Sequence, residues 1–195
     1  MHLQKGKKIL IYLFLFLIVG SINNIALTKI NFEKIKSIQI SGLNQNQNIN
    51  LLENIKELNI KNIFFLNGKE ISKIISSNSL VENYEIFKKY PNALDIKIER
   101  TKFLAKINNN GKTFLIGTNG KLSDVKFSDK ELPFIFGKPK IDEFIKFTHV
   151  IEQSKLPLNQ IKNLYFFPSK RWDLELKNNV ILKLSKDHTK LSLDQ

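Results

Sequence analysis

The sequence predicts an α+β protein: an apolar N-terminal helix, then a mixed unit of two helices and three strands, then a mainly antiparallel β unit with one or two helices. Three observations support this prediction. An apolar run follows a short basic terminus, the apolar pattern becomes periodic from Glu33 onward, and Asn-Gly turn signals gather beyond Arg100. A chain of 195 residues accommodates two small domains behind a leader.

The leader carries a membrane signal, because a basic terminus is followed by an unbroken apolar run of eleven residues, Ile9–Val19. That length suits a cleavable signal peptide with Val19-Gly20-Ser21 as the cleavage site. Extended to Leu27, the segment instead forms a helix of about 28 Å, which just crosses the hydrocarbon core. We favour this second interpretation, a signal anchor over residues 9–27 behind a cytoplasmic tail of residues 1–8, because long domains are translocated regardless of charge.

The first folded unit, expected over residues 33–100, has the order strand, helix, helix, strand, strand. Strands are predicted where apolar and polar residues alternate, and helices where apolar residues recur three or four apart. Asn67 and Glu70 form a capping pair at the start of the second helix, and Pro91 enforces a bend between the last two strands. The elements are expected at residues 38–42, 49–55, 67–75, 81–87 and 93–98.

The second unit, expected over residues 101–195, is rich in hairpins. Asn110-Gly111 and Asn119-Gly120 are turn signals, because both positions of a type I′ turn need a positive φ. A helix is expected over Asp142–Gln153, and a final hairpin turns at Asn178-Asn179.

The final hairpin supplies the candidate core and binding residues. Trp172, Leu174 and Leu176 are expected to face the interior, because side chains of a strand alternate with period two. If the sheet ends at this hairpin, its last strand becomes an exposed edge where another strand could pair. Val180 and Leu182 are therefore candidate partner-binding residues.

Composition and motifs argue against an enzyme. The chain has no cysteine and three histidines, and none of the histidines has metal-ligand spacing to another histidine or a carboxylate. Nucleophile, phosphate-loop and zinc-protease motifs are absent from the sequence. We therefore expect no catalytic residue, no cofactor, no metal ion and no small-molecule substrate.

The net charge of +13 raises the question of nucleic acid or an anionic membrane. Of the 31 basic residues only Arg100 and Arg171 are arginines, whereas phosphate and base recognition favour arginine, so we expect no nucleic acid. Lys88-Lys89-Tyr90 could touch anionic lipid head groups or cell-wall polymers, although a solvated turn is the simpler interpretation.

Six phrases of the sequence, in this order, resemble the FtsQ/DivIB family of bacterial cell-division proteins. The most specific is KYPNAL running into IKIER at the end of the first unit. Two departures stand out: Gly117 replaces a usual aspartate, and the segment after Arg100 lacks a usual proline. The phrases lie at residues 38–42, 62–66, 89–100, 115–120, 132–137 and 171–174.

The resemblance implies a transmembrane signal anchor, a POTRA domain over residues 33–100 and a β domain over residues 101–195. Family members normally continue through another helix and terminal strands, so this β domain is either short for the family or incomplete at its C-terminus. It implies a non-enzymatic divisome scaffold that recruits and holds division proteins at the septum and links them to septal peptidoglycan synthesis. FtsB and FtsL are the implied partners, with further divisome components at the POTRA domain. The implied location is the inner membrane, with the N-terminus cytoplasmic and both domains periplasmic.

By the same resemblance, Arg171 lies near the face that docks a coiled-coil partner, and we expect it to contact an acidic residue there. Two other classes of protein stay open. One is a POTRA-bearing envelope binding or secretion factor that pairs strands with its substrates. The other is an exported envelope enzyme released by signal cleavage, for which the sequence offers no catalytic set.

Overall fold

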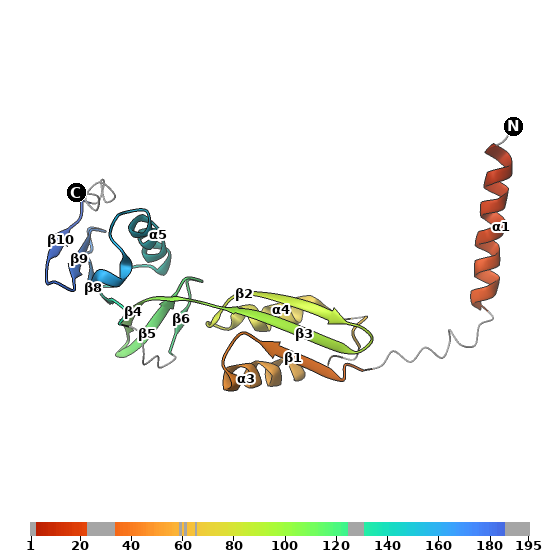
Figure 1. Cartoon of the computed structure of the whole chain (residues 1–195), viewed down its shortest axis with the longest axis horizontal. Coiled ribbons are helices and arrows are strands. Elements are labelled where there is room, and N and C mark those ends of the chain that lie inside the picture. Colours follow the sequence, from red (N-terminus) through yellow and green to blue (C-terminus); the bar gives the residue numbers. More distant parts are fainter. Residues whose placement is uncertain are drawn as a thin grey trace.

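The computed structural model describes residues 3–22, 34–58, 60, 62–64, 66–124 and 131–185. These residues form an N-terminal helix, a three-stranded sheet and a seven-stranded sheet, and each sheet has its own hydrophobic core (Figure 1). We call residues 37–100 the first unit and residues 103–185 the second unit. The protein is therefore α+β with two mixed sheets, in the order that the periodicity predicts.

The N-terminal helix α1 (Leu3–Ile22) holds the apolar run of the leader. From Ile9 to Leu17 every side chain is exposed, by 49% to 78%. None of the helices among the described residues has both the length and the apolar character needed to cross a membrane. The anchor expected over residues 9–27 continues past Ile22 into residues outside the described ranges.

The first unit packs two helices on one face of the sheet β1-β3-β2, in which β1 is parallel and β2 antiparallel to β3. Asn44 and Gln47 form a capping box at the start of α3. Asn67 caps α4 by accepting from the Lys69 N–H, so Asn67 fills the predicted role without a reciprocal bond from Glu70. The elements are β1 (Ser37–Ser41), α3 (Gln45–Lys56), α4 (Gly68–Ser77), β2 (Val81–Lys89) and β3 (Ala93–Arg100).

The second unit is a sheet of order β10-β9-β8-β7-β4-β5-β6, with α5 packed on one face. The pairs β4–β7 and β7–β8 are parallel and the other four pairs are antiparallel. The elements are β4 (Phe103–Asn109), β5 (Lys112–Gly117), β6 (Leu122–Ser123), β7 (Phe134–Phe136), α5 (Ile141–Glu152), the 3-10 helix η1 (Leu158–Gln160), β8 (Ile161–Phe166), β9 (Trp172–Leu176) and β10 (Ile181–Lys183).

Polar contacts join the two units where β3 runs into β4. The hydroxyls of Thr101 and Thr118 donate to one carboxylate oxygen of Glu82, at 2.7 and 2.6 Å. The amide of Asn119 donates to the carbonyls of Ser79 and Val81, at 3.0 and 2.8 Å. These bonds hold the β5–β6 turn of the second unit against β2 and the loop before it, so the junction is more than a flexible linker.

Candidate functional site

The candidate site lies on the hairpin β9–β10, whose turn at Asn178-Asn179 is the one predicted from sequence. Asn179 has a φ of +65°, which asparagine tolerates better than most residues. Its N–H donates to the carbonyl of Leu176 and closes the turn. The hairpin is the last described part of the sheet, and it separates an inner face under α5 from an outer face.

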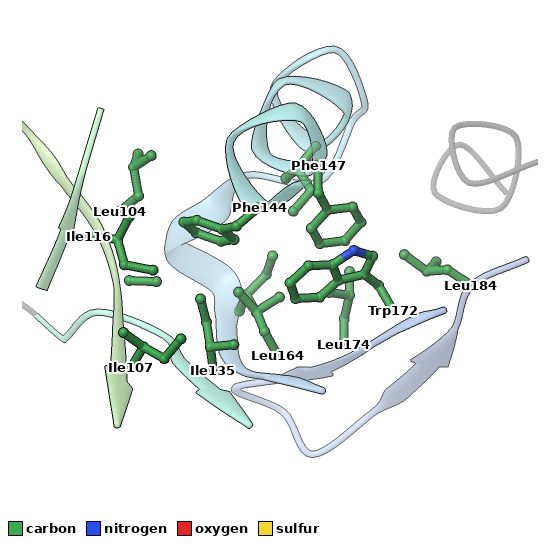
Figure 2. Packing of buried hydrophobic residues seen from close by; sticks show 13 residues of the cluster. Leu104, Ile107, Ile116, Ile135, Phe144, Phe147, Leu164, Trp172, Leu174 and Leu184 are labelled. Carbon is green, nitrogen blue, oxygen red and sulfur yellow. The ribbon is translucent and has the colours of Figure 1, made fainter. Parts of the chain in front are cut away.

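The inner face of the hairpin is built around Trp172. Its indole is 7% exposed and stacks on Phe147 of α5, with ring centroids 4.5 Å apart and planes 3° from parallel. Leu174 is fully buried beside it (Figure 2), and Leu176 is half-buried at the margin of the same core. The structure thus places all three candidate core residues on the side that packs against α5.

Arg171 and Asp173 form a bidentate ion pair on the outer face. The Nε and Nη2 atoms of Arg171 lie 3.0 and 3.1 Å from the two carboxylate oxygens of Asp173. The guanidinium also lies over the ring of Phe167, with Cζ 4.7 Å from the centroid. Asp173 is therefore 5% exposed, whereas alternation alone places it in solvent. Two of the five guanidinium donors are used in these bonds, and three remain for a partner.

Glu175 is the centre of a second polar cluster on the outer face. Its carboxylate accepts from Lys162 at 2.8 Å, from Asn163 at 2.9 Å and from the hydroxyl of Tyr165 at 2.7 Å. These bonds lower the pKa of Glu175 to about 2, with the bond from Asn163 the largest cause, followed by those from Lys162 and Tyr165. The carboxylate in turn raises the pKa of both Lys162 and Tyr165. These three hydrogen bonds hold the charged carboxylate of Glu175 in one position on the outer face.

An aromatic strip adjoins this cluster on β7 and β8. Phe136 stacks on Tyr165 with centroids 5.1 Å apart and planes 11° from parallel, and it also contacts Phe134 at 4.9 Å. Phe136 is 45% exposed. The sequence pattern did not single out Phe136 as a surface residue, because its three-residue strand is too short to show alternation.

The edge of β10 is unpaired in the described part of the sheet, where β10 pairs with β9 alone. Bonds to β9 are made by the Val180 carbonyl and by the Leu184 N–H, at 2.9 and 3.1 Å. Because bonded residues alternate along an antiparallel ladder, Ile181 and Lys183 turn their backbone N–H and C=O groups away from β9. Their outward groups form a short template for another strand.

The two candidate binding residues of this strand lie in different surroundings. Val180 is 45% exposed at the turn, while Leu182 is half-buried and packs against the core. Ile181, which the sequence pattern did not single out, is 58% exposed. The site therefore combines an open strand edge, an exposed isoleucine and a partly satisfied arginine. In the described residues no group of three or more histidines and acids could hold a metal ion.

The comparisons with known proteins agree with one another. The family model for the FtsQ-type POTRA domain matches residues 33–100. The cell division protein DivIB of Clostridium botulinum (strain Loch Maree) is 32% identical over 154 residues, covering 73% of this chain and 57% of the relative. DivIB of Clostridium acetobutylicum is 30% identical over 98 residues, covering 50% of this chain and 39% of the relative. Residues 33–100 match the FtsQ-type POTRA domain, and the relatives support the FtsQ/DivIB family for this chain.

The chain spans about two fifths to three fifths of the length of these two relatives. A solved structure of the major extracytoplasmic domain of DivIB from Geobacillus stearothermophilus also matches, at 15% identity with a TM-score of 0.36. That match covers 48% of this chain and 83% of the other.

One of the phrases that resemble the FtsQ/DivIB family has a clear physical reason in the structure. Gly42, which closes the first strand, has a φ of +111°, and a Cβ there would overlap the backbone carbonyl of Ile98. Only glycine fits both the backbone conformation and the close approach to β3. The phrase IQISG thus marks the exit of β1 from the POTRA sheet.

Proposed function

We propose that this chain is a non-enzymatic scaffold of the cell-division machinery, which binds another division protein along the outer edge of β10, unpaired among the described residues. Support comes from the FtsQ-type POTRA match over residues 33–100 and from relatives named as cell division proteins. Strand pairing at a sheet edge needs no catalytic group, because the backbone supplies the affinity and neighbouring side chains the specificity.

The observation that carries this proposal is the geometry of Ile181. Its backbone N–H and C=O point away from β9, and its side chain is 58% exposed. An edge with exposed apolar side chains is a template for pairing, and proteins ordinarily block such edges. Arg171 lies on the same hairpin with three guanidinium donors beyond those used by Asp173, which suits an acidic residue on the partner.

The proposed partners are those that the family resemblance implies. FtsB and FtsL are the proposed partners of the second unit, and further divisome components would meet the first unit, the POTRA domain. We place the anchor in the inner membrane, the N-terminus in the cytoplasm and both units in the periplasm at the septum. Support for the anchor is the exposed apolar surface of α1 from Ile9 to Leu17. We also propose that the chain divides into functional domains near Arg100, where the first sheet ends.

The experiment compares Ile181→Pro with Ile181→Thr in capture of FtsB from the same cell. Proline removes the outward N–H of residue 181 and leaves the bonds of β9 to its neighbours, since proline is tolerated at a strand edge. Threonine keeps that N–H and shortens the side chain. We expect Ile181→Pro to weaken capture of FtsB at least tenfold. The loss of capture for Ile181→Thr should be several times smaller than that for Ile181→Pro. Both variants should retain the fluorescence of Trp172.

Equal capture by all three chains would refute pairing at this edge. Localisation tests the wider role, because a fluorescent fusion should form a ring at midcell in dividing cells. A uniform envelope signal would favour a secretion or binding factor of another kind.

A further inference from the structure

One end of the first unit is defined by the start of β1 and the β2–β3 turn. Because β1 runs parallel to β3, Ser37 lies beside Ala93, and the Lys36 N–H donates to the carbonyl of Asn92 at 2.9 Å. The second unit follows from the opposite end of β3 (Figure 1). We call this end, with its loop at residues 62–64, the basal end. It is the end from which the chain continues toward α1.

Two aromatic rings are exposed together at the basal end. Phe64 and Tyr90 are 50% and 62% exposed, and their ring centroids lie 5.1 Å apart at 43°. The neighbouring Ile63 is fully buried, so the loop that presents Phe64 is anchored in the core. Single exposed apolar residues are common on protein surfaces and need no explanation. Two large rings that contact each other in solvent, one on a loop and one on a turn, instead indicate a contact surface.

The basal end is also rich in lysine. Both helices contribute, because α3 ends here and α4 begins here. Among the described residues, the acids at this end are Glu57, Glu70 and Asp95, and Asp95 pairs with Lys89 at 2.7 Å. The lysines of the basal end are Lys34, Lys36, Lys56, Lys69, Lys88 and Lys89. In the described part of this end lysines outnumber acids, which favours contact with an anionic surface.

We propose that the basal end docks on an anionic lipid surface, with Phe64 and Tyr90 at the level of the head groups and the lysines on lipid phosphates. Aromatic rings concentrate at the membrane–water interface, and lysines near an anionic leaflet attract it. A soluble polyanion would match the lysines but not the exposed rings.

Chain length makes this docking feasible. Eleven residues separate Ile22 of α1 from Lys34. A chain of this length spans at most about 43 Å, so the basal end stays close to any membrane that holds α1. This inference rests on the membrane attachment of α1 proposed above and is independent of the binding edge at β10.

The test uses the full chain carrying Phe64→Trp, mixed with vesicles of phosphatidylglycerol and phosphatidylcholine whose lipids are brominated near the head group. Trp172 is the only native tryptophan and lies in the core of the second unit, so the unmodified chain supplies the baseline signal. We expect the added tryptophan to be quenched on anionic vesicles and much less on pure phosphatidylcholine. Phe136→Trp, at a comparably exposed site of the second unit, should stay unquenched.

Charge removal gives the second arm. Lys69→Gln with Lys88→Gln should lower the docking equilibrium constant about 25-fold, taking about fivefold for each lysine at an anionic surface. The matched control, Lys112→Gln with Lys146→Gln, removes the same charge from exposed sites of the second unit and should leave quenching unchanged.

Flotation of the vesicles separates the possible failures. A chain that floats while its tryptophan at position 64 is unquenched overturns this inference alone. A chain that does not float with anionic vesicles overturns both this inference and the proposed membrane attachment. Emission that responds to an added soluble polyanion but not to brominated lipid also overturns it, in favour of an acidic polymer.

Discussion

Replacement of Trp172 by alanine should unfold the second unit selectively. The indole is 7% exposed and contacts three rings, with centroids 4.5 Å away at Phe147, 4.8 Å at Phe166 and 6.2 Å at Phe144. Figure 2 shows Phe144 and Phe147 beside the indole. Truncating a buried tryptophan to alanine costs about 3–5 kcal/mol. Three ring contacts, each contributing about 0.5–1.5 kcal/mol beyond area burial, place the expected loss at about 4–5 kcal/mol. That is most of the stability of a small domain.

The assay must resolve the two units, because Trp172 is the only tryptophan and its fluorescence is lost in the variant. Amide hydrogen exchange measured residue by residue resolves the two units. Protection from exchange should be lost in β8, β9 and α5 and should persist in β3. The control is Trp172→Phe, which keeps a ring against Phe147 and should lose less than half as much stability. A loss below about 1.5 kcal/mol for Trp172→Ala would refute the enclosed position of the indole, since even the mildest large-to-alanine core substitutions cost about 2 kcal/mol.

Three further predictions concern the ion pair, the acid limb and the junction. Arg171→Ala should lower the free energy of unfolding by about 1–3 kcal/mol, because the buried carboxylate of Asp173 loses two bonds, and Arg171→Ala/Asp173→Asn should recover part of it in urea titrations. The lowered pKa of Glu175 contributes to the free energy of unfolding above pH 4.5, and this contribution is lost as the pH falls toward about 2. Glu175→Gln should therefore make the free energy of unfolding less dependent on pH between these values. Gly117→Asp should displace Thr101 and loosen the two units, which small-angle scattering would record as a wider distribution of shapes.

The sequence predicted the elements whose signals are local. Asn67 caps α4, the expected helix over Asp142–Gln153 is α5, and the turn at Asn178-Asn179 joins β9 to β10. Each depends on a few neighbouring residues, either through a cap or through the period of the apolar side chains. The order of the first unit was predicted for the same reason, since its helices and strands are long enough to show their periods.

Sheet order and side-chain pairing depend on distant residues and were not predictable. The strand β7 has three residues and lies between β4 and β8, parallel to both, which no local pattern indicates. Asp173 lies on the outer face as alternation requires, yet it is buried, because Arg171 shares that face and folds over it. The period of a strand therefore predicts on which face a side chain lies, whereas its burial depends on which neighbouring side chains cover that face.

The junction explains the two departures from the family phrases. A Cβ at Gly117 would lie 2.6 Å from the hydroxyl of Thr101, so glycine leaves the space that this threonine occupies. Thr101 is 4% exposed and donates to Glu82, a bond that proline could not make. The two departures therefore belong together, because Gly117 and Thr101, which replace the usual residues, both take part in one contact between the units. The same polar bonds set the orientation of the β5–β6 turn against β2, so they fix how the first unit meets the second at this junction.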